Sequence, residues 1–171
     1  MNIGELTKLG EIFEESLNEK HLQATFKNTD AYNFFNKQEW AGSLDSRYGE
    51  APIAIDWNWG GNKANLYLTK NYNLNINIKD ENTIDFTYSI TTENTSKTTT
   101  YPEGDYTNYQ RIYIPANATL LSTNGFENNT FSTIKESGFK VVGGWFNIPI
   151  QNTKTLEISY RLTRDSSTFP L

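Results

Sequence analysis

The feature that most restricts the fold is a strict alternation of apolar residues with asparagine between residues 71 and 78. Because successive side chains of a β-strand point to opposite faces, this segment is expected to be a strand with one buried row and one row facing water. The expected buried row is Tyr72, Leu74, Ile76 and Ile78, and the expected solvent row is Asn71, Asn73, Asn75 and Asn77. A second alternating segment follows the turn Lys79–Thr83, so we predict an antiparallel hairpin of 71–79 with 83–93.

The same period of two occurs on both sides of this hairpin. From Pro52 onward, Ile53, Ile55, Trp57 and Trp59 share one face, which we expect to be the core face, and Ala54, Asp56 and Asn58 share the other. Gly60-Gly61-Asn62 is a turn signal. Further strands are predicted at 109–114, 119–123, 131–136, 139–150 and 156–162, and Gly143-Gly144 indicates a bulge or a sharp bend in the fourth of them.

The first fifty residues follow a different pattern. Apolar residues at spacings of three and four predict an amphipathic helix over about 3–19, packed on the domain or on a part of the protein outside this chain. A short strand is predicted at 22–26, a second helix from a cap at Asp30 to about Gln38, and a loop at 40–49.

These elements favour a mainly β fold, an antiparallel β-sandwich of about eight strands preceded by one or two α-helices, with an immunoglobulin-like arrangement as one option. An α/β fold would require helices between the strands. We assign residues 1–50 to a helical cap segment and residues 51–171 to the sandwich, in one compact unit.

Composition narrows the classes of function. The 171 residues carry a net charge of −5 and no cysteine, and 14% of them are aromatic. This acidic balance argues against nucleic-acid binding, which requires a basic face. Mean hydropathy is low (−0.64), but the polarity comes from asparagine and threonine rather than from charge, which is typical of a folded β protein with a polar surface.

Residues that could support catalysis or bind a metal are few. His21 is the only histidine, and we expect it to lie at a surface junction rather than in a catalytic triad. No metal site and no cofactor are predicted, because the acidic turns at 80–82 and 103–105 lack an EF-hand pattern. An enzyme with paired carboxylates stays an alternative, and Asp56, Asp85, Asp105 and Glu157 are its candidates.

Five residues are the candidate binding site. Asp56 and Asn58 precede the Gly60-Gly61 turn and Lys63 follows it, so this group forms a small polar site or pins a hairpin. Arg111 lies between Tyr109 and Tyr113, in a pattern that resembles a cation–π stack. Trp59, at the end of its strand, is the tryptophan best placed to stack on a sugar ring, although packing in the core is the simpler interpretation of the tryptophans.

A series of motifs resembles, in order, the C-terminal part of the bacterial "domain of unknown function 4012" family. The motifs are Glu19-Lys-His-Leu22, Trp40-Ala-Gly42, Ala54-Ile-Asp-Trp-Asn58, Gly60-Gly-Asn-Lys63, the segment 104–115, Gly143-Gly-Trp-Phe146 and the segment 154–162. The resemblance covers roughly residues 19–163. Members of that family look like exported, membrane-anchored envelope proteins whose upstream part is distantly similar to LytR-CpsA-Psr enzymes.

The resemblance implies that this chain is a piece of a longer protein. Its membrane contact would be made only by a segment absent from this chain, since no stretch here approaches the ~18 apolar residues of a transmembrane helix. The catalytic residues of the upstream enzymes have no counterpart here. We therefore expect a non-catalytic module on the extracellular face of the envelope, with cell-wall glycan or another envelope protein as partner. A cytoplasmic or phage-borne structural domain that acts by oligomerisation is the other alternative.

Overall fold

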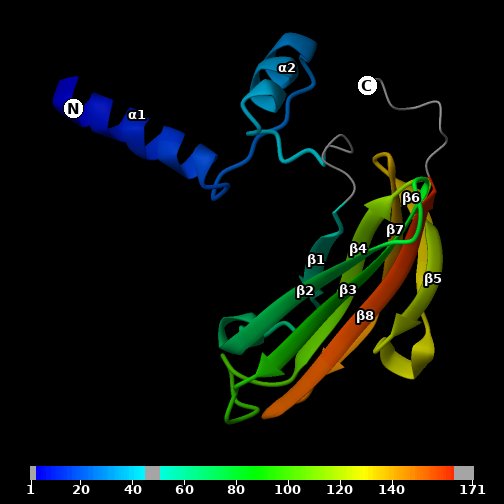
Figure 1. Ribbon diagram of the computed structural model, residues 1–171. Coiled ribbons are helices and arrows are strands. Elements are labelled where there is room, and N and C mark those ends of the chain that lie inside the picture. The colour runs from blue at the N-terminus through cyan, green and yellow to red at the C-terminus, as the bar shows by residue number, and fades with distance from the viewer. Residues whose placement is uncertain (1–2, 45–50, 164–171) are drawn as a thin grey trace. The chain divides into compact units, whose positions relative to one another are not determined.

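The computed structural model describes residues 3–44 and 51–163 and divides the chain into two compact units, 1–45 and 46–171. The first unit contains α1 (Ile3–Asn18) and α2 (Thr29–Lys37). The second contains eight strands (Figure 1). They are β1 (Ile53–Asn58), β2 (Leu68–Ile78), β3 (Thr83–Asn94), β4 (Tyr106–Pro115), β5 (Thr119–Asn124), β6 (Ser132–Glu136), β7 (Phe139–Ile148) and β8 (Asn152–Thr163).

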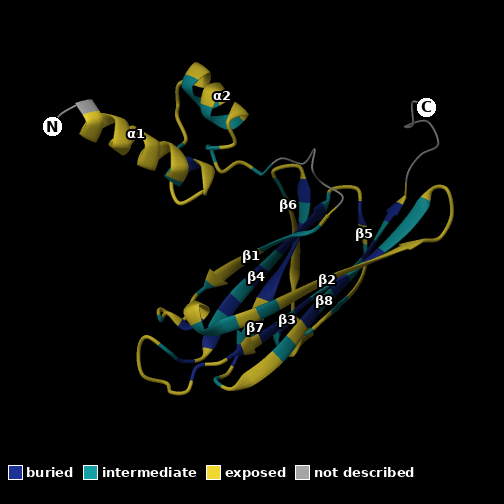
Figure 2. Cartoon of the chain, turned by 60° about the vertical axis from the view of Figure 1, so that its left-hand side comes forward, coloured by how far each residue is buried: buried dark blue, intermediate teal, exposed yellow. Residues whose placement is uncertain are grey.

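The predicted helices of the first unit are confirmed, with two corrections. The cap of α2 is Asn28, whose side chain accepts a hydrogen bond from the Ala31 amide, and not Asp30. Residues 22–26 form no strand. Phe26 packs instead against Phe35, with ring centroids 4.6 Å apart, so its apolar character reflects an aromatic contact. Most of the α1 surface is exposed, although Leu17 is buried (Figure 2).

The strands form the predicted antiparallel sandwich, in two sheets of four. The first sheet has the order β1-β4-β7-β6 and the second has the order β2-β3-β8-β5. In an immunoglobulin domain the first two strands, A and B, are neighbours, whereas here β1 and β2 lie in different sheets. The predicted hairpin is present as β2 and β3, paired without a break from Leu68 opposite Asn94 to Ile78 opposite Ile84.

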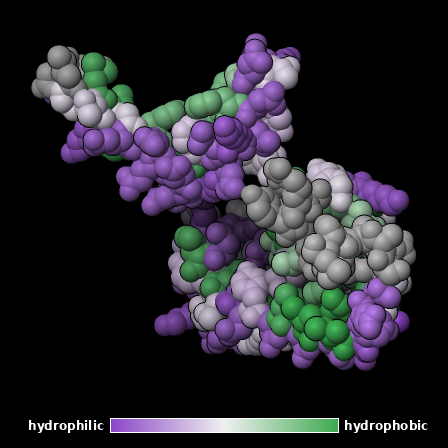
Figure 3. Space-filling model, turned by 45° about the horizontal axis from the view of Figure 1, so that its top comes forward, coloured by the Kyte–Doolittle hydropathy of each residue, from purple (hydrophilic) through white to green (hydrophobic). Residues whose placement is uncertain are grey.

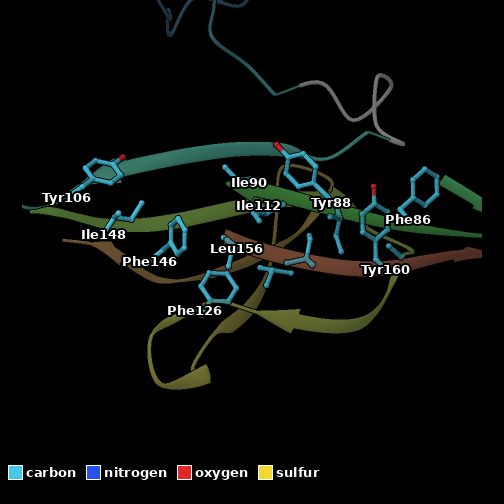
Figure 4. Packing of buried hydrophobic residues seen from close by; sticks show 14 of the residues in the cluster. Phe86, Tyr88, Ile90, Tyr106, Ile112, Phe126, Phe146, Ile148, Leu156 and Tyr160 are labelled. Carbon is cyan, nitrogen blue, oxygen red and sulfur yellow. The ribbon is translucent and has the colours of Figure 1, made fainter. Parts of the chain in front are cut away.

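The core lies between the inner faces of the two sheets. Figure 4 shows it as a row of aromatic and aliphatic side chains with Tyr106 at one end and Phe86 and Tyr160 at the other. The rings of Phe86 and Tyr160 are stacked at 4.9 Å. Tyr106, Phe86 and Tyr160 are each at most 3% exposed, so both ends of this row are closed to water.

The apolar row of β2 is not buried, contrary to our prediction. Tyr72, Leu74, Ile76 and Ile78 lie opposite core residues of β3 and share their face, but they are 37–72% exposed. The reason is the difference in length between two edge strands. β2 has 11 residues, whereas β1, at the edge of the other sheet, has only six, so the other sheet does not cover the whole of β2. Figure 2 shows β2 as largely exposed, and Figure 3 shows apolar side chains on the surface of the strand unit.

Gly143 and Gly144 produce no bulge, contrary to our prediction for this strand. The pairing of β4 with β7 runs in register through both glycines. The two glycines make room instead: a Cβ on Gly144 would lie 2.6 Å from the Phe126 ring, and one on Gly143 would lie 3.0 Å from the Tyr109 hydroxyl. The register shift of the sandwich lies in β5, between Leu120 and Ser122.

Candidate functional site

Four aromatic residues gather on the outer face of the first sheet, and we call them the aromatic surface: Trp57, Trp59, Tyr109 and Trp145. Trp57 lies opposite Tyr109, and Tyr109 lies opposite Trp145, so three of the rings form one row across β1, β4 and β7. The ring centroids of Trp57 and Trp59 are 4.7 Å apart, those of Trp59 and Trp145 6.0 Å, and those of Tyr109 and Trp145 5.3 Å. All three contacts are edge-to-face, an arrangement that aromatic pairs prefer.

The tryptophans of this surface are open to solvent. Trp57 is 55% exposed, Trp59 57% and Trp145 39%. Soluble proteins seldom leave contiguous apolar surface uncovered unless it contacts something. The aromatic surface is therefore the strongest candidate for a binding site among the described residues.

The position of these tryptophans reverses our prediction for β1. We expected Trp57 and Trp59 to face the core, but Ala54, Asp56 and Asn58 face it instead. Ala54 lies opposite the core residue Ile112 and packs against the core cluster. The two faces of β1 are therefore exchanged relative to our prediction, with Trp57 and Trp59 on the outer face of the first sheet.

The polar border of the aromatic surface is built around Arg111. The guanidinium of Arg111 binds Glu136 at 2.6 Å and lies over the Tyr113 ring, 5.2 Å from its centroid, as the sequence suggested. The Tyr113 hydroxyl donates to the same carboxylate at 2.9 Å. The hydrogen bond from Arg111, and to a lesser extent the one from Tyr113, holds the pKa of Glu136 below its usual value. Arg111 thus lies on the same face as the tryptophans, but its charge is already paired.

A polar cluster lies on the opposite, inner side of β1, and we define it as Asp56, Lys70, Asn108 and Gln110. Lys70 of β2 forms an ion pair with Asp56 across the gap between the two sheets, and its ammonium lies 5.6 Å from the centroid of the Tyr106 ring. Asn108 donates to the other oxygen of Asp56 at 3.4 Å and to Gln110 Oε1 at 3.2 Å. Asn108 and Gln110 are at most 1% exposed.

Three tyrosines near this cluster have raised pKa values, and the charge of Asp56 contributes to each shift. Burial, and secondarily the negative charge of Asp56, raises the pKa of Tyr72. Burial raises the pKa of Tyr88 to about 12 and that of Tyr106 further, with Asp56 contributing to both. The three phenols are therefore neutral at physiological pH. Tyr88 and Tyr106 are buried, whereas Tyr72 is 57% exposed.

The structure separates the five predicted site residues. Trp59 and Arg111 lie on the outer face of the first sheet, whereas Asp56 belongs to the inner polar cluster. Asn58 holds the turn, because its side chain accepts from the Gly60 amide and donates to the Asn62 carbonyl. Lys63 is exposed and does not pair with Asp56, whose partner is Lys70.

Sequence reasoning missed Lys70, Asn108 and Gln110, as well as Tyr109 as a member of the aromatic surface. The sequence did contain a signal for Asn108 and Gln110. In β4 they alternate in step with the core residues Ile112 and Ile114 and so lie on the same face of the strand. Nothing in the sequence connects Lys70 to Asp56, because they meet across two sheets.

The carboxylates of the enzymatic alternative do not share a site. Asp56 is bound to Lys70, and Asp85 accepts from Nε and Nη2 of Arg161 on the outer face of the second sheet. Glu157 pairs with Ser89, four residues along β3 from Asp85, and Asp105 accepts from the Ile150 amide. Residues 3–44 and 51–163 contain no group of three acidic, histidine or cysteine side chains that could hold a metal ion.

Other candidates from the sequence have local roles. His21 is exposed beside Glu19, at 3.2 Å. Asp80 accepts from the Asn82 amide in the turn between β2 and β3, and Glu103 accepts from the amides of Lys97 and Thr98. Among the described helices, neither is long and apolar enough to cross a bilayer.

Comparison of the sequence with protein-family models found no matching family, and a search of curated proteins also returned no match.

Proposed function

We propose that this protein is a non-catalytic module on the extracellular face of a bacterial envelope, and that it recognises cell-wall glycan through its aromatic surface. The observation that carries the proposal is the row of Trp57, Tyr109 and Trp145 on an open sheet face, extended by Trp59. The envelope setting is supported by the resemblance of residues 19–163 to the "domain of unknown function 4012" family.

The chemistry of sugars fits such a surface. One face of a pyranose ring presents C–H groups that pack on an aromatic ring, and large rigid side chains supply this contact at little entropic cost. Polar side chains on the same sheet face could bind the hydroxyl groups of the sugar. Tyr109 and Ser132 already meet there, with their oxygens 3.2 Å apart, and Thr107 and Asn147 face each other across β4 and β7.

The test is binding of the full chain to purified cell-wall sacculi, and calorimetric titration with soluble oligosaccharides of N-acetylglucosamine. Trp59→Ala and Trp145→Ala should each weaken binding about tenfold, which corresponds to about 1.4 kcal/mol. Neither change should lower the thermal midpoint of the sandwich much, because both side chains are exposed.

Tyr101→Ala is the matched control, because Tyr101 is an aromatic residue 67% exposed outside the aromatic surface. It should bind like the unchanged protein. The proposal fails if the unchanged chain binds no glycan, or if the two tryptophan variants bind as well as the control.

A further inference from the structure

Three reactive groups meet at the carboxylate of Asp56. One oxygen, Oδ2, accepts from the Lys70 ammonium, and the other, Oδ1, lies 3.4 Å from the Asn108 amide nitrogen. Lys70 belongs to β2 and Asn108 to β4, so the carboxylate joins an amine from one sheet to a carboxamide from the other.

The surroundings activate the carboxamide. The Trp57 backbone amide donates to Asn108 Oδ1 at 2.9 Å, so it polarises the carbonyl and would stabilise negative charge that develops on that oxygen. The Asn108 side chain is fully buried, and the Lys70 side chain is only 15% exposed. The Asp56 side chain is 34% exposed, so the site is partly screened from water, and electrostatic effects in it are stronger than in bulk solvent.

We propose that Lys70 and Asn108 form an intramolecular isopeptide bond, with Asp56 as the proton carrier between them. Asp56 Oδ2 takes a proton from the Lys70 ammonium, and the freed Nζ attacks Cγ of Asn108. The new C–N bond forms as the original C–N bond of the carboxamide breaks. Asp56 passes this proton to the leaving nitrogen, which departs as ammonia, then takes the second proton that Nζ loses and transfers it to the ammonia, so that ammonium leaves and the carboxylate of Asp56 is restored.

Asn108 is a better acyl donor than Asp56 itself. A carboxylate repels a nucleophile through its negative charge, and condensation of Lys70 with Asp56 would have to expel water from that anion. The carboxamide is neutral, and its oxygen already accepts a hydrogen bond from a backbone amide. The two reactions differ in the mass lost, ammonia against water, which makes them separable.

Such a bond would tie the two sheets together covalently in a chain that has no cysteine. It would close a loop between residues 70 and 108, and a cross-link of this kind restricts the unfolded chain as a disulfide does. The inference is independent of glycan binding, because it uses the inner face of β1 and not the aromatic surface.

The first test is the intact mass of the full chain after incubation at neutral pH. We expect a mass about 17 Da below that of the sequence, the loss of one ammonia. An unchanged mass overturns the proposal, and a loss of about 18 Da overturns the assignment to Asn108 by placing the bond on Asp56.

Tryptic mapping locates the bond. Acylation of Lys70 should prevent cleavage after it, so that residues 64–79 remain joined to residues 98–111. Recovery of 64–70 and 71–79 as separate peptides overturns the proposal.

Lys70→Arg keeps the positive charge but cannot form the bond, so it should show the full mass of its sequence. Lys63→Arg is the matched control, because Lys63 is an exposed lysine seven residues away, and it should retain the loss. Asp56→Ala should also show the full mass, and circular dichroism would establish whether it still folds. Retention of the loss in Lys70→Arg would overturn the proposal.

Discussion

Among single residues, Glu136 shows how the surface of the first sheet is held in place. It receives the Arg111 guanidinium and the Tyr113 hydroxyl at once, at 2.6 and 2.9 Å. Isolated surface ion pairs contribute little to stability, but a carboxylate with two fixed donors orders both of them. Arg111 is therefore best understood as a support at the border of the aromatic surface.

The lowered pKa of Glu136 predicts a pH dependence of stability. The folded-state pKa lies below the unfolded value of about 4.3, so its contribution is present above that pH and is lost as pH falls through the folded pKa. Glu136→Gln should reduce the loss of unfolding free energy between about pH 5 and pH 3, measured by urea titration at each pH. Glu81→Gln, in the exposed turn between β2 and β3, is the control. Equal curves for both variants would contradict the prediction.

Among the elements, β1 and β2 show what alternation can and cannot reveal. The alternation in β2 correctly predicted a strand, its hairpin with β3 and the residues that share each face. It could not predict burial, because burial depends on whether the other sheet extends over the strand. In β1 the same reasoning chose the wrong face, since hydrophobicity alone cannot distinguish a core face from an aromatic surface exposed to solvent.

The two glycines of β7 give a prediction for that strand. Gly144→Ala should destabilise the sandwich by about 1–3 kcal/mol, because the added carbon would lie 2.6 Å from the Phe126 ring and 2.9 Å from the Thr130 carbonyl oxygen. Gly10→Ala in α1 is the opposite case, with nothing within 4 Å of the added carbon, and should favour its helix by about 0.5–1 kcal/mol. Chemical denaturation followed by circular dichroism measures both. A neutral Gly144→Ala would show that the close approach is relieved at no cost.

At the scale of the molecule, the fold class was predictable and the site was not. The strand and helix patterns are local, so the sequence shows them directly. The candidate site depends on which strands become neighbours, and the order β1-β4-β7-β6 brings together residues as distant as Trp57 and Trp145. Lys70 and Asp56 likewise meet only because β1 and β2 enter different sheets.

The division into two units predicts that the sandwich folds alone. All members of the core cluster and of the aromatic surface lie between residues 54 and 162. A chain that begins at Ser46 should therefore unfold cooperatively, with a thermal midpoint within about 3 °C of that of the sandwich in the full chain. It should also bind glycan with unchanged affinity. Loss of cooperative unfolding, seen by calorimetry, would contradict this.

The placement of the tryptophans also allows ligand binding to be followed by intrinsic tryptophan fluorescence. Three of the four tryptophans of the chain belong to the aromatic surface, and the fourth, Trp40, lies in the helical unit. Ultraviolet emission from the indoles should therefore come mainly from that surface. A ligand that covers it should shift the emission to shorter wavelength and shield it from quenching by acrylamide, without any added dye.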